Sequence, residues 1–389
     1  MFLSEAYYVV LKLTEQCNLR CSYCYVPDKD QATELMNMDI FKTFCEKLAA
    51  ESRYDWIRLL YHGGEPLLWG KENFIESAGI VDWLEKKHHK KLYKVIQSNG
   101  TLIDEEWVEL FKKYDFHIGV SLDGPPSIHN LVRQRAEDTV RGIRLMQSAG
   151  QRVGILTVVG RHNIDRINEV MDYFVNELGI TSIKIHDVQA LSYNNSDNLA
   201  INVDEFLDML VKVYQQYTLK GIANEANTYN DIKKYLDFKR KGIVSQSICH
   251  SPWCQAGSSI IGLKLDGTLL PCGRWYGVPD VELGNIRDSD SHLVLKRMEF
   301  VKRYLLLKDE TWEKCKNCQK APICRFNCTA WQYMTTGSNG VEEMSCKRAQ
   351  RFWELFEQDQ AKLNQLFDSK KVRNRIINNK AIGQNKEDC

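Results

Sequence analysis

The chain carries Cys17-Asn18-Leu19-Arg20-Cys21-Ser22-Tyr23-Cys24 directly after residues 7–13, an apolar run of β-branched and aromatic residues that predicts a strand. The three cysteines have CX3CX2C spacing. Three thiolates are one fewer than a zinc ion or a fully protein-bound [4Fe–4S] cluster usually takes. An iron left without a protein ligand can bind another molecule. The alternative is a zinc site that takes its fourth ligand from elsewhere, such as His62.

The composition narrows the class of protein. Of 389 residues, 52 are Lys or Arg and 51 are Asp or Glu, which leaves a formal net charge of +1. Because basic and acidic residues are so nearly equal in number, a partner bound mainly by overall charge is disfavoured. We therefore expect neither nucleic acid nor a membrane surface as partner. The N-terminus lacks the features of a signal peptide, which predicts a cytoplasmic protein. In a reducing compartment, clustered cysteines such as those among the 13 here are more readily explained as metal ligands than as disulfides.

Hydrophobic periodicity predicts an α/β fold for the first half of the chain. Strand patterns alternate with helical patterns, for instance at 38–51, 104–113, 135–149 and 163–178. The expected strands are residues 7–13, 57–61, 92–97, 116–121, 153–159 and 182–187. Six successive βα units imply a parallel sheet with helices outside it. Periodicity alone does not choose between an open doubly wound sheet and a closed or partial barrel.

Polar and glycine-rich motifs follow the expected strands. Gly63-Gly64-Glu65-Pro66 comes after the second strand, Ser98-Asn99 after the third, and Ser121-Leu122-Asp123 at the end of the fourth. The carboxyl ends of parallel strands form the ligand face of such folds. We therefore expect the cysteine loop and these motifs to share one rim.

The second half of the chain has a different organisation. We expect a helical bridge at 191–244, with helical patterns at 203–217 and 229–241, after a first domain at 1–190. A hairpin with an Asp-Gly turn at 260–271 opens a cysteine-rich domain at 245–350 with little further regular pattern. An amphipathic helical pattern spans 348–366, and a polar tail follows it. We place the boundary of the last segment at 351, so that this segment is 351–389.

Eight cysteines gather in the cysteine-rich domain: Cys249, Cys254, Cys272, Cys315, Cys318, Cys324, Cys328 and Cys346. Eight thiolates are enough for two [4Fe–4S] clusters in which every iron has a protein ligand. A pair of zinc ribbons is the alternative, because CX2C spacing also suits zinc. Cys45 and Cys389 are left over; we expect Cys45 to lie in the core and Cys389 to be inert.

The three-cysteine loop followed by Gly-Gly-Glu-Pro resembles the radical S-adenosylmethionine (SAM) superfamily, and the later cysteine block resembles the SPASM domain of radical SAM enzymes that modify peptides and proteins. The resemblance is closest to the anaerobic sulfatase-maturase-like branch. It implies a partial (β/α)6 TIM-like barrel with a C-terminal SPASM domain. It also implies bound SAM and three [4Fe–4S] clusters, one that binds SAM and two auxiliary ones.

The resemblance assigns roles to individual residues. Cys17, Cys21 and Cys24 would hold the SAM-binding cluster, with Gly63, Gly64 and Glu65 at the SAM amino group. Tyr23 would lie beside the adenine, and the ribose and carboxylate of SAM would contact Ser98, Asn99, Ser121, Asp123 and Arg133. The nearer auxiliary cluster would take Cys249, Cys254, Cys272 and Cys328. The outer one would take Cys315, Cys318, Cys324 and Cys346.

The chemistry implied by this branch is reductive cleavage of SAM to a 5′-deoxyadenosyl radical, hydrogen abstraction from a peptide residue and net two-electron oxidation. Sulfatase maturases place a catalytic aspartate directly after the third ligand of the nearer auxiliary cluster. Here that residue is Gly273, which cannot accept a proton. We expect a cross-link in a precursor peptide, an aromatic cyclophane first and a thioether second. Asp187 or His186 is the candidate base, and strand alternation lets only one of them point inward.

Other functions stay open at this point. Within the same fold the chain could form formylglycine with a different base, or epimerise a peptide residue with a cysteine as hydrogen donor. Outside it, a zinc-stapled binding protein would have no redox chemistry. The expected partners are a ribosomally made precursor peptide and an electron donor such as flavodoxin or ferredoxin. Because the chain begins almost at its first strand, we expect the bridge, the SPASM face or a separate leader-binding protein to recognise the leader.

Overall fold

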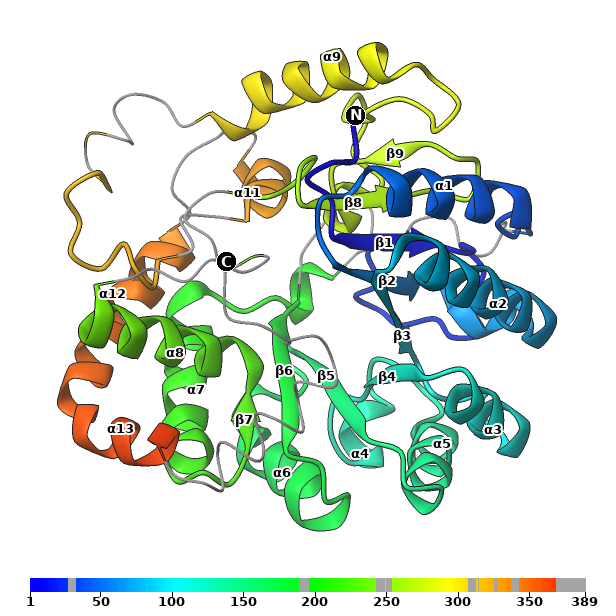
Figure 1. Ribbon diagram of the computed structural model, residues 1–389. Coiled ribbons are helices and arrows are strands. Elements are labelled where there is room, and N and C mark those ends of the chain that lie inside the picture. Colours follow the sequence, from blue (N-terminus) through cyan, green and yellow to red (C-terminus); the bar gives the residue numbers. More distant parts are fainter. Residues whose placement is uncertain are drawn as a thin grey trace.

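The computed structural model describes residues 1–26, 33–188, 196–242, 249, 254–306, 313, 315–324, 328–336 and 343–368 (Figure 1). All six strands expected in the first half are present, each within two residues of the expected bounds. They are β1 (Tyr8–Lys12), β2 (Trp56–His62), β3 (Lys91–Ser98), β4 (Phe116–Ser121), β5 (Val153–Val159) and β6 (Ser182–Asp187).

The strand order shows a partial barrel. Within the described chain, one nine-stranded sheet runs β7-β6-β5-β4-β3-β2-β1-β8-β9, so β1 to β6 follow one another without a reversal. A doubly wound sheet would reverse direction near its middle. The edge strands β7 (Asn224–Glu225) and β9 (Leu269–Leu270) end the sheet without pairing to each other, which leaves it open.

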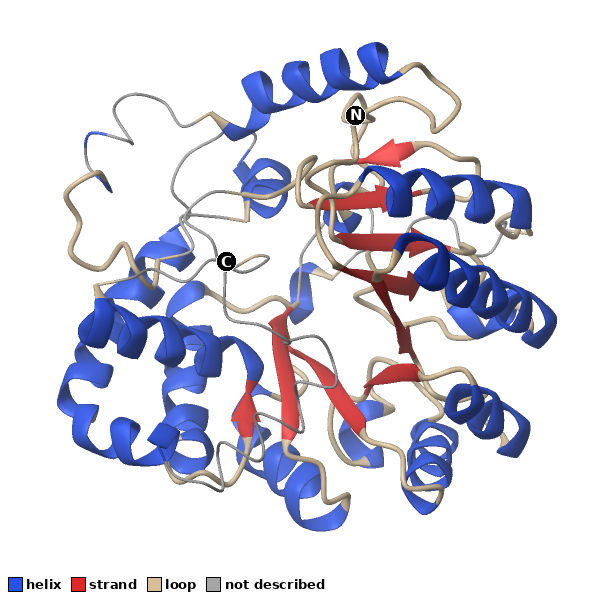
Figure 2. Cartoon of the chain, in the orientation of Figure 1, coloured by secondary structure: helices blue, strands red, loops and turns tan. Residues whose placement is uncertain are grey.

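Helices cover the outer face of the curved sheet (Figure 2). On β2 the residues alternate in burial, and Ile57, Leu59 and Tyr61 pack into the helix-side core. The other face of each strand looks into the concave interior. The covering helices and turns are α1 (Met38–Glu51), a 3₁₀ turn (Pro66–Trp69), α2 (Lys71–His88), α3 (Glu105–Lys113), α4 (Pro126–His129), α5 (Ala136–Ser148), a 3₁₀ turn (Ile164–Arg166), α6 (Ile167–Asp172) and a π-helical turn (Tyr173–Glu177).

The bridge and the C-terminal helices pack together beside β6 (Figure 1). A buried ion pair joins Arg348 Nη2 to Asp231 Oδ2 at 2.9 Å, and Arg348 also donates to Thr228 Oγ1 at 3.1 Å. The single helix expected at 348–366 is in fact two. The elements are a 3₁₀ turn (Asp197–Leu199), α7 (Val203–Val213), a π-helical turn (Tyr214–Thr218), α8 (Ala226–Lys241), α12 (Glu343–Gln358) and α13 (Gln360–Asp368).

The expected hairpin at 260–271 is confirmed, with Leu263 opposite Leu269. Its first strand, β8 (Ile260–Leu263), pairs in parallel with β1 and so extends the barrel sheet. The expectation of little further regular pattern was wrong. The region contains a 3₁₀ turn (Gly273–Trp275), α9 (Asp290–Phe300), a π-helical turn (Val301–Leu305) and α11 (Thr329–Thr336).

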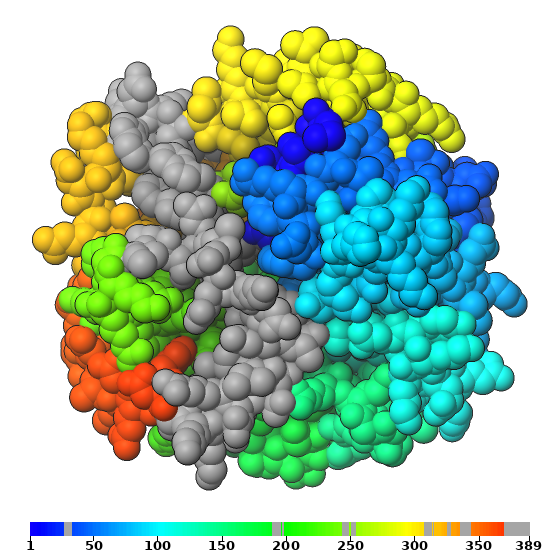
Figure 3. Space-filling model, in the orientation of Figure 1, coloured from blue at the N-terminus to red at the C-terminus, as the bar shows by residue number. Residues whose placement is uncertain are grey.

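The C-terminal region is held together by aromatic packing, which hydrophobic periodicity in the sequence does not reveal. The buried ring of Trp275 contacts Phe300, Tyr304 and Tyr333, with ring centroids 5.1 to 5.8 Å apart. The N-terminal part of the chain and α9 lie side by side on one face (Figure 3). There Lys47 of α1 pairs with Asp290 of α9 at 2.7 Å.

No helix in the described part of the chain is long and apolar enough to span a bilayer.

Candidate active site

The cysteine loop is anchored to the Gly-Gly-Glu motif through the backbone. Gly64 N–H donates to Thr14 O at 2.8 Å, and Glu65 N–H donates to Gln16 O at 2.7 Å. A Cβ at Gly63 would lie 2.2 Å from Thr14 O, and one at Gly64 would lie 2.2 Å from Gln16 O. Only glycine fits at either position. The close approach that the glycines allow is therefore to the segment that leads into Cys17.

Glu65 is fully buried beneath this loop. Its carboxylate accepts hydrogen bonds from Asn99 N–H at 2.7 Å, Ser98 Oγ at 2.8 Å and Leu67 N–H at 3.1 Å. Burial raises the pKa of Glu65 to about 7 although these donors favour the charged form. Among the described residues no cation forms an ion pair with this carboxylate, and the charge of Arg133 favours its ionised form only weakly, so a ligand ammonium group would stabilise the charged form.

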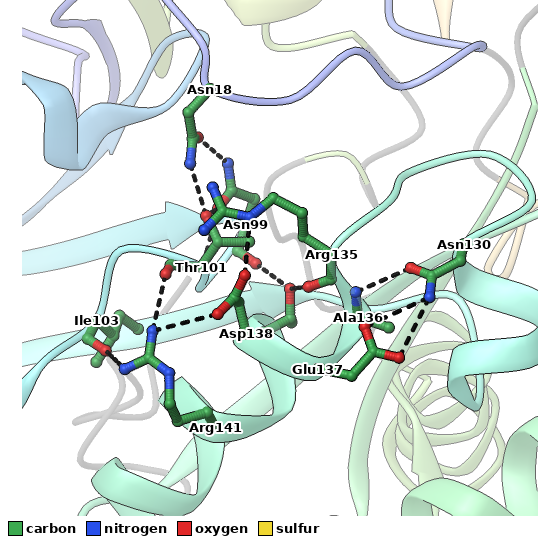
Figure 4. A network of polar contacts seen from close by, with 11 residues as sticks. Asn18, Asn99, Thr101, Ile103, Asn130, Arg135, Ala136, Glu137, Asp138 and Arg141 are labelled. Atoms are coloured by element: carbon green, nitrogen blue, oxygen red, sulfur yellow. Dashed lines mark hydrogen bonds and ion pairs between the residues drawn. The ribbon is translucent and has the colours of Figure 1, made fainter.

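The end of β3 fastens the cysteine loop from a second side (Figure 4). Asn99 Nδ2 donates to Asn18 Oδ1 at 2.8 Å, and Asn18 Nδ2 donates to Thr101 Oγ1 at 2.7 Å. Thr139 of α5 donates to Asn99 O at 2.9 Å. Asn99 therefore positions the loop that contains Cys17 and Cys21. Sequence reasoning did not single out Asn18, which lies between two predicted ligands.

Tyr23 joins the cysteine loop to the β4 end of the rim. Its hydroxyl donates to Asp123 Oδ2 and accepts from Arg133 Nη1 at 2.8 Å, while Val158 N–H donates to Asp123 Oδ1 at 2.9 Å. Burial is the main cause that raises the pKa of Tyr23 well above its usual value. The predicted residues Tyr23, Asp123 and Arg133 thus form one buried network. Ser121, nearby, accepts from Gln97 Nε2 at 3.0 Å.

Several buried polar atoms around this network have no hydrogen-bond partner among the described residues. They are Arg133 Nε, His129 Nε2 and both ring nitrogens of His162. The His162 ring stacks on Tyr23 with centroids 6.0 Å apart. Unpartnered buried polar atoms are rare in folded proteins, and a polar ligand such as SAM would supply partners for them. His162 was missed by sequence reasoning, although it follows β5 as the other motifs follow their strands.

A second group of side chains lies inside the barrel between the cysteine loop and the C-terminal domain. Lys12 at the end of β1 is 2% exposed; its Nζ donates to Tyr25 OH at 2.8 Å and lies 4.7 Å from the ring centroid of Tyr276. His62, beside Lys12 on β2, has a pKa lowered to about 3, chiefly by burial and then by Lys12. A cation so near disfavours the zinc site with His62 as fourth ligand.

Electrostatic interactions link the thiols assigned to the nearer auxiliary cluster. Burial, and after it the thiols of Cys254, Cys328 and Cys249, raise the pKa of Cys272 well above its usual value. Burial and Cys328 raise the pKa of Cys254 to about 11. The four thiols therefore influence one another electrostatically.

The remaining cysteines occupy separate places. Cys318 N–H donates to Cys315 O at 3.0 Å in a tight turn, Cys324 is buried, and Cys346 lies exposed on α12. No three Cys, His, Asp or Glu side chains among the described residues lie close enough to hold a single metal ion. Cys45 is fully buried in α1, which confirms its expected place in the core. Cys389 lies outside the described residues.

The candidate base Asp187 is the last residue of β6. Burial raises its pKa, and the opposing influence is the guanidinium of Arg274. Arg274 follows Gly273 in the 3₁₀ turn after Cys272. Asp187 and Arg274 both keep some exposed surface. The structure thus links the candidate base electrostatically to Arg274, two residues after the predicted ligand Cys272.

Comparison with known protein families gives two matches. Residues 11–174 match the Radical SAM superfamily, and residues 254–319 match the SPASM iron–sulfur cluster-binding domain. A cysteine-type anaerobic sulfatase-maturating enzyme of Clostridium novyi is 24% identical over 88% of this chain and 92% of its own. An uncharacterised Methanocaldococcus jannaschii protein is 32% identical over 53% of this chain and 71% of its own. For an uncharacterised Synechocystis protein the identity is 28%, over 54% of this chain and 53% of its own.

Solved structures agree on the fold. The structure of histidine-tagged anSMEcpe with bound AdoMet covers 96% of this chain and 98% of its own, with a TM-score of 0.77 and 23% identity. Streptococcus suis SuiB bound to precursor peptide SuiA covers 88% of this chain and 76% of its own, with a TM-score of 0.62 and 15% identity. With its open parallel barrel and its cysteine-rich C-terminal region, the chain contains a radical SAM domain followed by a SPASM domain.

Proposed function

We propose that the protein oxidises a side chain of a ribosomally made precursor peptide to a cross-link, a carbon–carbon cyclophane first and a thioether second. The observation that carries this proposal is the environment of Gly273. Residue 273 follows Cys272 and has no side chain, and a Cβ there would lie 3.0 Å from Val10 Cγ1. A side chain at position 273 would therefore press against the barrel residue Val10. The structure of SuiB bound to its precursor peptide supports a peptide substrate for this fold.

The rim residues would hold SAM. Cys17, Cys21 and Cys24 would bind its cluster, and Glu65 would bind its ammonium group, because this buried carboxylate has a raised pKa that a ligand cation would lower. Gly63, Gly64 and Asn99 would fix the loop, and Ser98 would hold the Glu65 carboxylate. Arg133, with an unpartnered Nε, would bind the SAM carboxylate beside Tyr23, Ser121 and Asp123. Bound SAM would supply the radical that removes a hydrogen atom from the peptide.

Asp187 would receive the proton that leaves the peptide during oxidation. Its raised pKa favours proton uptake. The second and third [4Fe–4S] clusters would take Cys249, Cys254, Cys272 and Cys328, and Cys315, Cys318, Cys324 and Cys346. Flavodoxin or ferredoxin would donate electrons, and a separate protein could present the leader in the cytoplasm. We retain the domain division 1–190, 191–244, 245–350 and 351–389 as part of the proposal.

Formylglycine formation is the second candidate. The similarity to the sulfatase-maturating enzyme of Clostridium novyi extends over 88% of this chain and favours it. It would require Asp187 to act as base in place of residue 273. Epimerisation would need a cysteine that donates a hydrogen atom to the peptide. Cys45 is fully buried in the hydrophobic core, where a peptide cannot reach it.

Two measurements test the class of protein. Replacement of Cys17, Cys21 and Cys24 by alanine should abolish 5′-deoxyadenosine formation with dithionite as reductant. The matched control is Cys45→Ala, which removes a core thiol and should retain SAM cleavage. Iron and sulfide analysis of anaerobically purified protein should give iron and labile sulfide in equal amounts. Zinc without labile sulfide would overturn the proposal in favour of a zinc-stapled binding protein.

A further inference from the structure

Lys12 is a buried cation on the concave face of the barrel. Along β1, Val9 and Leu11 pack into the helix-side core, so strand alternation turns Val10 and Lys12 toward the interior. A Cβ at Gly273 would meet Val10, which agrees with this direction. Lys12 is only 2% exposed, so its ammonium group lies outside bulk water.

Two tyrosine rings flank the Lys12 ammonium group. Its Nζ donates to Tyr25 OH at 2.8 Å and lies 4.8 Å from the ring centroid of Tyr25 and 4.7 Å from that of Tyr276. Tyr25 directly follows Cys24, whereas Tyr276 belongs to the SPASM domain, and both rings pack with Val26. Aromatic faces attract a cation but do not neutralise it. The cation is thus fixed between the cysteine loop and the C-terminal domain.

Among the described residues Lys12 has these contacts and no ion pair. Lys94, also buried, pairs with Asp82 at 2.7 Å. The carboxylate that feels the charge of Lys12 is Glu15; burial raises its pKa, and Lys264 opposes that shift before Lys12 does. Burial of a cation without a paired carboxylate is costly. An anionic ligand would supply the counter-charge.

His62 adds a neutral donor beside Lys12. The two residues are partners in the pairing of β1 with β2. Gly63 N–H donates to His62 Nδ1 at 2.7 Å, which assigns the ring proton to Nε2. Nε2 makes no hydrogen bond to another described residue. His62 and Tyr25 both keep some exposed surface, so the group can be reached from the interior.

We propose that Lys12 and His62 bind the carboxylate of an acidic side chain in the peptide substrate. Lys12 Nζ supplies the charge, His62 Nε2–H donates a hydrogen bond, and Tyr25 OH holds the ammonium group in place. The inference rests on the proposed function, since a peptide must enter the barrel. It narrows the substrate class to peptides with Asp or Glu close to the residue that is modified.

Equilibrium binding of two labelled peptides to the iron–sulfur protein with SAM, without reductant, tests this assignment. The probes are acetylated and amidated Gly-Trp-Gly-Glu-Gly and the same peptide with Gln in place of Glu. Fluorescence anisotropy should show that the Glu peptide binds at least about tenfold more tightly, because the desolvated cation pairs only with the carboxylate. Lys12→Met should remove this preference, and Lys12→Arg should keep part of it.

Two further variants separate charge from hydrogen bonding. His62→Phe should weaken both peptides alike, because the side chains of Glu and Gln both accept a hydrogen bond. Lys94→Met is the matched control: it removes a buried lysine from the helix side of the sheet and should leave the preference unchanged.

Equal affinity of the native protein for the two peptides, or no binding of the Glu peptide at millimolar concentration, overturns the proposal. This comparison needs no variant, so it holds even if Lys12→Met fails to fold. Weaker SAM binding in Lys12→Met with an unchanged peptide preference would assign the cation to the SAM carboxylate and also overturn it. Because no turnover is measured, failure of the cross-linking function leaves these results unaffected.

Discussion

Gly273 of the SPASM domain lies against Val10 of β1, so closely that a Cβ at position 273 would be 3.0 Å from Val10 Cγ1 and 3.3 Å from Val10 Cβ. Val10 is buried on the strand that leads into the cysteine loop. The contact packs the segment that follows Cys272 directly against the barrel.

Gly273→Asp should destabilise the protein by about 1–3 kcal/mol, because the added side chain overpacks the junction with Val10. Val10→Ala alone removes two buried methyl groups and should cost about 2 kcal/mol. In the double variant the space vacated by Val10 accepts the new Cβ. The double variant should therefore be more stable than the sum of the single changes implies, as neighbours in contact do not behave additively. Thermal unfolding of the four proteins measures this coupling; strict additivity would contradict the contact.

Glu65 should make the stability of the SAM-free protein depend on pH. Its pKa is about 7 in the folded protein against about 4.5 when unfolded, so the folded state binds more protons between these values. Stability should therefore fall as pH rises from about 4.5 to 7, by roughly 3 kcal/mol in total. Unfolding measured between pH 5 and 8 should show this loss in the native sequence and a flatter profile in Glu65→Gln.

Ser98→Ala is a matched variant for this prediction. Ser98 Oγ donates to Glu65 at 2.8 Å, and loss of that donor should raise the pKa of Glu65 further and extend the pH-dependent window upward. If Glu65→Gln retained the full pH dependence, another group would be responsible. Added SAM should reduce the dependence in the native sequence, since its ammonium group favours the charged carboxylate.

Removal of Arg348 should be strongly destabilising. Its side chain is 9% exposed and pairs with Asp231, which is 2% exposed. Arg348→Met would leave a buried carboxylate without its cation, at a cost of about 3–5 kcal/mol. Lys239→Met breaks a half-exposed pair with Glu357 and should cost less than about 1 kcal/mol. Unfolding of both variants under one condition checks the contrast, and equal costs would contradict a structural role for the pair.

Much of the barrel could be predicted from the sequence because its signals are local. The six strands have β-branched alternation, and the motifs follow strand ends, where a parallel sheet gathers them. Glu65 and Asn99 thus reach the cysteine loop as expected for one rim. His162 is not part of a recognisable sequence motif. Its stacking on Tyr23 depends on the path that the chain takes after β5, which the sequence pattern does not predict.

The SPASM domain was predicted less well for a physical reason. Its cysteine spacing indicates ligands but not secondary structure, and α9 has mixed polar and apolar exposure. The aromatic core around Trp275 joins residues far apart in the chain, which periodicity cannot register. The pairing of β8 with β1 and the contact of Gly273 with Val10 are likewise tertiary. Only the hairpin, with its Asp-Gly turn, had a local signal.

The most direct test of the proposed function is mass spectrometry of a precursor peptide with aromatic residues in its C-terminal core. The peptide is incubated anaerobically with the iron–sulfur protein, SAM and a reductant. The account predicts a product that has lost two hydrogen atoms, with fragmentation blocked between an aromatic residue and a neighbouring β-carbon. The control is the protein with Cys17, Cys21 and Cys24 replaced by alanine, which should leave the peptide unmodified. An unchanged peptide mass, together with formylglycine in a sulfatase peptide treated in the same way, would contradict the account.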